Sequence, residues 1–174
     1  MQIEFTGFAG DCLIQGQFDL QARRLTDQLN AASTIDLAHV VLEGLDGHRV
    51  STPTFRIDRA ELCAVVGRGP RGPRVLRIPT DKRRLQAQIG PYVALGRFHG
   101  PAGATTLRTF AQREPMVPLT NATIAYMVGG VLEVVDATTL IVNRELAVWY
   151  REAEEDPATR PTRLANAIPT ASES

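Results

Sequence analysis

The sequence of 174 residues contains two stretches that share an ordered series of residues. The triplet Gly16-Gln17-Phe18 recurs 80 residues later as Gly96-Arg97-Phe98. Further matches follow in the same order, at spacings of 82 to 85 residues: Leu25 with Leu107, Leu37 with Leu119, Asp58-Arg59 with Asn143-Arg144, and Leu62 with Leu146. The drift in spacing corresponds to one-residue insertions, which turns accommodate. Self-similarity of this kind predicts a duplicated structural unit.

Both stretches have the residue pattern of β-strands. Phe55 and Ile57 alternate with polar residues, Leu140 and Val142 do the same, and a short apolar run follows each pair. Two dipeptides, Asp46-Gly47 and Gly129-Gly130, follow the longer apolar runs. Both dipeptides adopt positive φ readily, as the centre of a two-residue hairpin requires.

Helical patterns are short and occupy matching positions, at residues 22–32 and 105–112. We therefore predict a mainly β chain of two tandem copies of a small five-stranded bent sheet or barrel, each with one short inserted helix. Residues 1–66 and 85–150 are assigned to the two copies. Residues 67–84 form a basic linker, and residues 151–174 form a mobile acidic and polar tail.

The strand pattern resembles the Sm-like barrel. The similarity rests on the middle strands TIDLAHVVLEG and MVPLTNATIAY, and on the segments FRIDRAELCAVV and LIVNRELAVWY that follow a hairpin. The segments RLTDQLN and VPLTNA are also similar to uncharacterised bacterial proteins that carry two such units. Ala60 and Glu145 stand where the family has Gly or His after the basic residue. The resemblance implies units that join through their edge strands, and it implies RNA as a ligand.

The linker is the strongest electrostatic feature of a chain with no net charge. Against Asp81 it carries seven basic residues, Arg68, Arg71, Arg74, Arg77, Lys82, Arg83 and Arg84. Such a run indicates either an arm that contacts phosphates or a solvated connector balanced by the acidic residues 152–156. No aromatic residues interleave with the arginines to stack on bases, so we favour the connector.

Arg59 and Arg144 are candidates for a site that the duplication presents twice. They either face a ligand such as RNA or belong to tight turns, in which Asp58 and Asn143 bond to the backbone. We favour the turns.

The sequence contains no recognised catalytic motif, and we predict that the protein is not an enzyme and has no cofactor. His39, His48 and His99 lack the spacing of metal ligands, so no metal is expected. Cys12 and Cys63 are interpreted as buried, reduced thiols.

No secretory signal or membrane span is expected from the sequence. The start of the chain lacks a basic segment followed by a long apolar run, and proline and glycine interrupt the uncharged residues 115–132. We expect a cytoplasmic protein.

Two classes of function remain. The first is a non-catalytic assembly or adaptor module that binds protein partners, or other copies of itself, through its sheet edges. Trp149 and Tyr150, on the apolar strand of residues 146–150, are its interface candidates. The second is an Sm-like RNA-binding protein that uses the linker and the two arginine turns. Zero net charge and the missing stacking aromatics favour the first class, most simply as a dimer or a small ring.

Overall fold

The structure, a computed structural model, describes residues 1–70 and 80–154. The first half of the chain forms five strands, one α-helix and one 3₁₀ turn: β1 (Gln2–Ala9), β2 (Cys12–Asp19), α1 (Leu25–Ala31), β3 (Thr34–Gly44), β4 (Arg49–Asp58), η1 (Arg59–Glu61) and β5 (Leu62–Val66). The second half has the same order: β6 (Thr80–Ile89), β7 (Tyr92–Pro101), α2 (Thr106–Ala111), β8 (Met116–Val128), β9 (Val131–Asn143), η3 (Arg144–Leu146) and β10 (Ala147–Glu152). The chain is therefore mainly β, as the sequence predicts.

The middle strand of each half bends at a residue with positive φ. His39 in β3 has φ of 51°, and Asn121 in β8 has φ of 46°. Both residue types adopt this left-handed region more readily than most. Side chains normally alternate between the two faces of a strand, but the bend turns residues three positions apart, Leu37 and Val40, to the same core.

Each bend lies against a glycine on the neighbouring strand. A Cβ at Gly16 would meet Val40 Cγ2 at 3.0 Å, and a Cβ at Gly96 would meet the Cβ of Leu119 at 2.8 Å and that of Ala122 at 2.9 Å. The strand register shifts at both glycines. The repeated glycine of the sequence is thus where each sheet curves.

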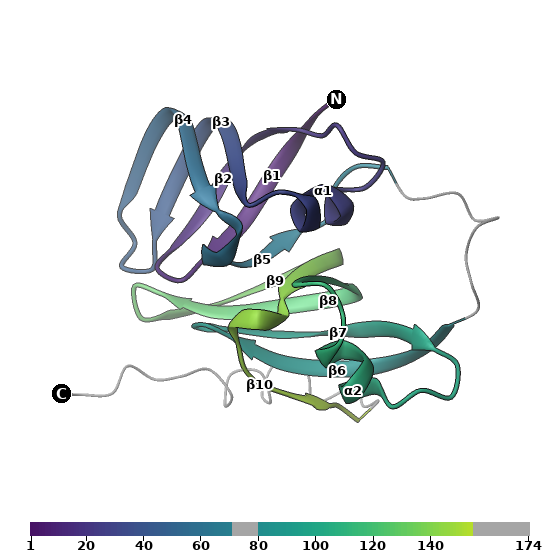
Figure 1. The fold of residues 1–174 in the computed structure, drawn as a ribbon. Helices are drawn as coiled ribbons and strands as arrows, with labels where there is room; N and C mark the ends of the chain where they lie inside the picture. The colour runs from purple at the N-terminus through teal and green to yellow at the C-terminus, as the bar shows by residue number, and fades with distance from the viewer. Residues whose placement is uncertain (71–79, 155–174) are drawn as a thin grey trace.

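The strands of the described residues form one antiparallel sheet of ten strands, in the order β10-β6-β7-β8-β9-β5-β1-β2-β3-β4. Strands β5 and β9 join the two halves, with Ala64, Val65 and Val66 opposite Val142, Ile141 and Leu140. In Figure 1 the halves lie one above the other and meet at these two strands. We call this pairing the internal joint. The outer strands of the sheet are β4 and β10.

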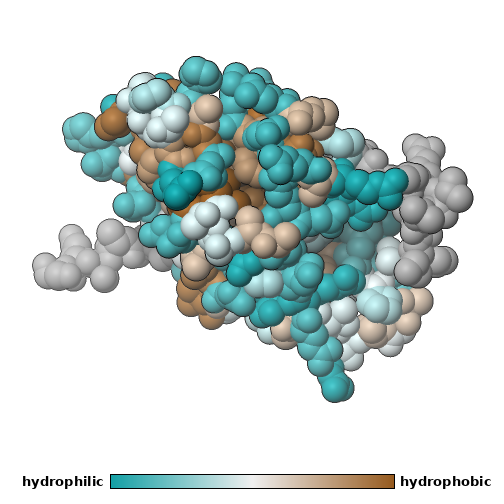
Figure 2. All heavy atoms as spheres, turned by 45° about the horizontal axis from the view of Figure 1, so that its top comes forward, coloured by the Kyte–Doolittle hydropathy of each residue, from teal (hydrophilic) through white to brown (hydrophobic). Residues whose placement is uncertain are grey.

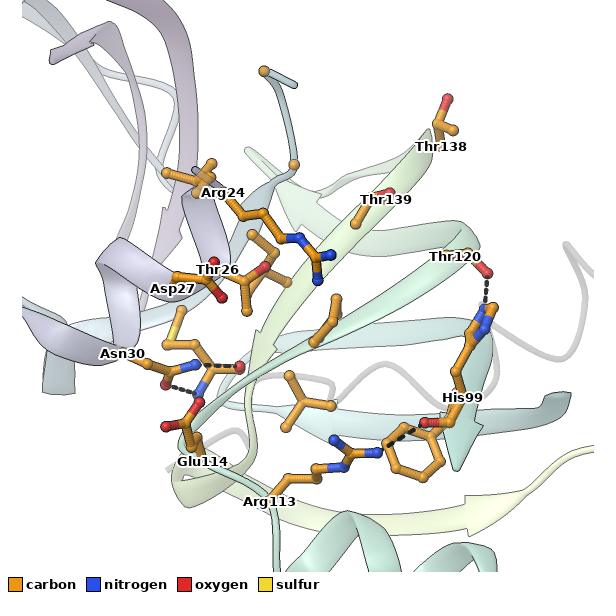
Figure 3. Close-up of a pocket in the computed structure, with 18 of the residues that line it drawn as sticks. Arg24, Thr26, Asp27, Asn30, His99, Arg113, Glu114, Thr120, Thr138 and Thr139 are labelled. Carbon is orange, nitrogen blue, oxygen red and sulfur yellow. Dashed lines mark hydrogen bonds between the residues drawn. The ribbon is translucent and has the colours of Figure 1, made fainter. Parts of the chain in front are cut away.

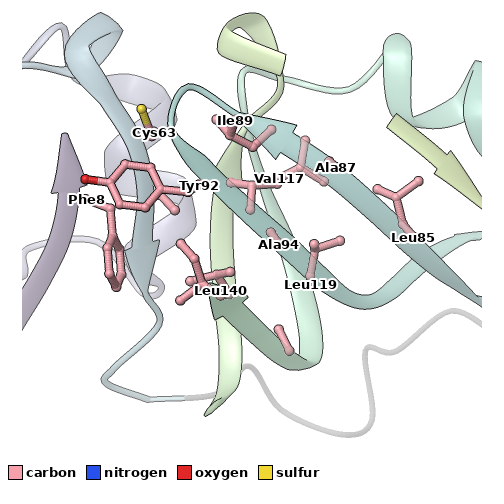
Figure 4. Close-up of a cluster of buried hydrophobic side chains, with 14 of the residues drawn as sticks. Phe8, Cys63, Leu85, Ala87, Ile89, Tyr92, Ala94, Val117, Leu119 and Leu140 are labelled. Carbon is pink, nitrogen blue, oxygen red and sulfur yellow. The ribbon is translucent and has the colours of Figure 1, made fainter. Parts of the chain in front are cut away.

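Two hydrophobic clusters fill the halves and exchange residues across the internal joint. The first-half cluster includes Met116 and Ile141 of the second half. The second-half cluster includes Phe8 and Cys63 of the first half, and Figure 4 shows both beside Tyr92. The rings of Phe8, Tyr92 and Tyr126 pack edge to face, with centroids 5.4 to 5.6 Å apart. Each half therefore completes its main hydrophobic cluster with residues of the other half.

Some element boundaries differ from the sequence assignments. Strand β6 begins at Thr80, so Lys82, Arg83 and Arg84 lie in a strand rather than in a linker. Strand β10 includes Arg151 and Glu152, which the sequence analysis placed in the tail. Among the described helices, none is long and apolar enough to cross a membrane.

Candidate functional site

The structure places both arginine candidates in 3₁₀ turns. Arg59 Nη1 donates a hydrogen bond to the carbonyl oxygen of Asn30 over 2.9 Å, and Arg144 Nε donates to the carbonyl oxygen of Arg113. Both acceptors lie at or just after the inserted helix of their own half. Arg59 and Arg144 thus tie each helix to the following turn, and this geometry supports a structural role.

The residue before each arginine holds its turn. The backbone N–H of Asp58 donates to Glu61 Oε2 over 3.4 Å. Asn143 is only 1% exposed and accepts a hydrogen bond from the backbone N–H of Glu145. Its Nδ2 donates to the carbonyl oxygens of Arg59 and Leu62 over 3.3 and 3.0 Å, so Asn143 also links the two halves.

The four described basic residues of the predicted linker have different surroundings. Arg68 pairs with Glu4, with 3.3 Å between Nη1 and Oε2. Lys82 and Arg83 are exposed on β6, whereas Arg84 is buried and its Nη1 donates to the carbonyl oxygen of Glu154 over 2.8 Å. Arg71, Arg74 and Arg77 lie outside the described residues.

The two cysteines are free thiols. Cys63 is buried and Cys12 is half-buried. Burial raises the pKa of both thiols to about 11, and nearby Asp11 adds to this effect at Cys12. Both are therefore protonated, and poor nucleophiles, at neutral pH. Within residues 1–70 and 80–154, no group of three His, Cys, Asp or Glu side chains is placed to hold a metal ion.

The interface candidates lie on β10, one of the two open edges, and they face opposite ways. The Tyr150 ring packs on Phe110 of its own half, with centroids 4.9 Å apart. The Trp149 Nε1 group donates to Gln88 Oε1 over 2.8 Å, and the Arg151 guanidinium lies 5.3 Å from the Trp149 ring centroid. Val148, the residue before Trp149 on the same strand, is 66% exposed.

Strand β4 forms the other open edge and is more polar. The Arg56 guanidinium makes two hydrogen bonds to Asp36 on β3, over 2.5 and 3.1 Å. Val50 is 61% exposed, and Pro53 lacks a backbone N–H for pairing. Charges and proline are typical of strand edges that avoid indiscriminate pairing. On the face shown in Figure 2, hydrophilic residues predominate and hydrophobic ones form separate groups.

Strands β5 and β10 each contain one β-bulge at the same position, β5 at the internal joint and β10 at an open edge. Cys63 interrupts the pairing of β5 with β1, and Val148 interrupts that of β10 with β6. Cys63 is buried against Gly90 in the β6–β7 turn, where a Cβ would meet its Sγ at 2.9 Å. By contrast, a Cβ at Gly10, in the equivalent β1–β2 turn, would meet nothing within 4 Å. The bulge residue Cys63 is therefore covered by the β6–β7 turn. The equivalent bulge residue, Val148, and the equivalent turn at Gly10 are both uncovered.

This equivalence corrects the register of the repeat by one residue. The sequence matches pair Leu62 with Leu146, but Leu62 begins β5 whereas Leu146 ends η3. Leu146 still packs on the second-half cluster, so its apolar character matches Leu62 without sharing its position. The two 3₁₀ turns and the two bulges agree in pairing Cys63 with Val148, at the same spacing as Asp58-Arg59 and Asn143-Arg144.

Comparison of this chain with protein-family models, with curated proteins and with solved structures found no match.

Proposed function

We propose that this protein is a non-catalytic assembly module, in which two tandem Sm-like units join to further copies through the open edges β4 and β10. The observation that carries the proposal is the internal joint, where a strand of the β10 type, β5, pairs with a strand of the β4 type, β9. A contact between copies would repeat within the assembly what the chain already does within itself.

The register of the internal joint transfers directly to such a contact. The two 3₁₀ turns align Ala64, Val65 and Val66 with Trp149, Tyr150 and Arg151, and Leu140, Ile141 and Val142 with Phe55, Arg56 and Ile57. Antiparallel pairing then sets Trp149 opposite Ile57, Tyr150 opposite Arg56, and Arg151 opposite Phe55 of the next copy. Each pair lies on one face of the sheet, where opposing side chains interact.

The side chains at the two edges are compatible in this register. Arg56 would lie opposite the ring of Tyr150, a cation–π pairing, and diagonal to the carboxylate of Glu152. Val148, which is 66% exposed, would cover the open β1–β2 turn at Gly10 of the next copy, as Cys63 covers Gly90. Covering an exposed valine removes apolar surface from water and favours association.

The proposed contact is head to tail, because it joins two different edges. Contacts of this kind close into rings when the rotation between copies allows it and otherwise extend into filaments. Pairing of β4 with a second β4 would instead bring the Arg56 side chains of both copies toward the same interface and would oppose a symmetric dimer.

Light scattering after size exclusion tests the proposal on the full chain. At concentrations of tens of micromolar, we expect particles larger than the 19.0 kDa monomer. Val148→Asp and Trp149→Lys should dissociate them and leave the circular-dichroism spectrum β-rich. Val134→Asp is the matched control, because Val134 is exposed but lies on β9, outside both proposed edges β4 and β10 and outside the three residues of β9 that pair with β5. A wild-type protein that elutes as a clean monomer overturns the proposal.

A further inference from the structure

A polar groove lies between the α1 region of the first half and strands β7, β8 and β9 of the second, and it encloses about 1020 Å³. In Figure 3, Arg24 and Asp27 line it from the α1 side, and Thr120 and Thr139 line it from the strands. Its volume is in the range of pockets that hold small molecules.

The groove contains polar groups that the described protein leaves without partners. The guanidinium of Arg24 extends into the groove in Figure 3 and forms no hydrogen bond or ion pair with any described residue. The same holds, within the described part of the chain, for the carboxylates of Asp27 and Glu114 and for the hydroxyls of Thr138 and Thr139. These groups offer one charged donor, two charged acceptors and two hydroxyls that serve as either.

Other polar side chains of the groove already form hydrogen bonds or ion pairs within the protein, which hold them in place. The Thr120 hydroxyl lies 2.7 Å from His99 Nε2. Arg113 donates from Nη2 to the carbonyl oxygen of His99 over 3.1 Å and lies over the Phe98 ring. Arg68 is paired with Glu4. Binding would therefore centre on Arg24.

We propose that this groove binds a small phosphorylated sugar. A guanidinium forms its strongest hydrogen bonds with phosphate or carboxylate oxygens, which favours a phosphate beside Arg24. Carboxylates accept hydrogen bonds from sugar hydroxyls, as acidic residues do with ribose in dinucleotide sites, and this gives Asp27 and Glu114 a role that a bare anion would not. A ligand with an anionic end and several hydroxyls matches both sets of groups.

The described lining of the groove contains no Trp or Tyr and no exposed Phe on which a nucleobase could stack. Phe98 is 2% exposed and lies beneath the Arg113 guanidinium, and the His99 ring contacts the Thr120 hydroxyl through Nε2. Base recognition in single-stranded nucleic acids relies on accessible aromatic faces. The sugar phosphate is therefore favoured over a nucleotide or an RNA strand.

Isothermal titration calorimetry of the full chain with ribose 5-phosphate tests this assignment. We expect saturable binding that weakens about tenfold or more in Arg24→Ala, because a charge-assisted hydrogen bond is lost. Arg23→Ala is the matched control, since Arg23 is an exposed neighbour that does not line the groove. Asp27→Asn should weaken the binding of ribose 5-phosphate and leave the weaker binding of inorganic phosphate unchanged.

Four results overturn the proposal: no binding of ribose 5-phosphate, equal losses in the Arg23 and Arg24 variants, ribose that binds as tightly as its phosphate, or adenosine monophosphate or an RNA oligonucleotide that displaces ribose 5-phosphate at lower concentration. Circular dichroism of Arg24→Ala verifies that the fold is retained, as expected for an exposed side chain without described partners.

Discussion

The first half, residues 1–66, and the second half, residues 80–152, have the same bends in their middle strands but differ in the surroundings of their last strands, β5 and β10. Both halves bend at a positive-φ residue in the middle strand, His39 or Asn121, and both tie the inserted helix to a 3₁₀ turn. Their edge strands differ in surroundings. Strand β5 is covered by β9, whereas the equivalent β10 has no strand beyond it in the described sheet.

The side chains follow this difference in surroundings. At the internal joint, Ile141 of β9 points into the cluster of the other half, and the equivalent residue on β4 is the ion-paired Arg56. Ala64 of β5 is buried, and its equivalent on β10 is the larger, partly exposed Trp149. The comparison teaches that the two halves have the same order of elements and the same bends, while each edge strand carries side chains suited to a buried or an open position.

The largest expected effect comes from the glycines at the bends. In Gly96→Ala the new Cβ would lie within 3 Å of the Cβ atoms of Leu119 and Ala122, so we expect the free energy of unfolding to fall by about 3 kcal/mol. In Gly16→Ala the new Cβ would meet Val40 Cγ2 at 3.0 Å and the carbonyl oxygen of Ala38 at 3.1 Å, both longer contacts than those at Gly96, so we expect about half the loss. Urea unfolding measures both, and a greater loss at Gly16 would contradict the ranking.

The next largest effect on stability is expected at the residues before the two 3₁₀ turns, where Asn143 and Asp58 should differ. Asn143→Ala leaves the buried carbonyl of Leu62 without its partner and should cost about 2 kcal/mol. Asp58→Ala alters an exposed turn and should change stability by about 0.5 kcal/mol or less. Equal losses in the two variants, measured by thermal or urea unfolding, would show that Asn143 does not link the halves.

Stability should decline in alkali because of Cys63. Its pKa is raised to about 11 by burial, so above about pH 9 the unfolded chain loses the thiol proton while the folded chain keeps it. The unfolded state then binds fewer protons, and the free energy of unfolding falls by roughly 2 kcal/mol up to pH 11. Unfolding titrations from pH 8 to pH 11 should give a shallower decline in Cys63→Ala. Val148→Ala, at the equivalent position, should decline as the wild type does.

The smallest expected effect on stability comes from Arg56→Ile, which gives β4 the residue found on β9. The ion pair with Asp36 is exposed, so its loss should leave the unfolding midpoint close to the wild-type value. Association should instead increase, because isoleucine is the residue at the equivalent position of the internal joint, Ile141, and burying it opposite Tyr150 removes more apolar surface from water than the cation–π pairing of Arg56 provides in the wild type. Light scattering at matched concentrations measures the change, and a variant that associates less than wild type would count against β4 as an open edge.

The sequence predicted the features that depend on local backbone geometry. The repeated glycines, the two-residue turn at Gly129-Gly130 and the Asp58 and Asn143 turns were visible because each position restricts the residue type. The prediction of a two-residue turn at Asp46-Gly47 was wrong, because β3 ends at Gly44 and β4 begins at Arg49, and Gly47 alone of the dipeptide has positive φ. The pairing of β5 with β9 was not predicted, since it depends on which distant strands meet. The bulge at Val148 was not predicted either, because a bulge residue needs no particular side chain. The groove at Arg24 joins residues of both halves and therefore needed the tertiary structure.

The exchange of core residues has a consequence for synthesis of the chain. The first-half cluster is completed by Met116, which is made midway through the second half, and by Ile141, which is made near its end. Until then, the nascent first half carries β5 as an uncovered apolar edge and lacks part of its interior. Such intermediates pair readily with other chains. The first half thus cannot complete its fold until β9 has been made. The rate of translation of the second half therefore sets how long the edge strand β5 remains unpaired.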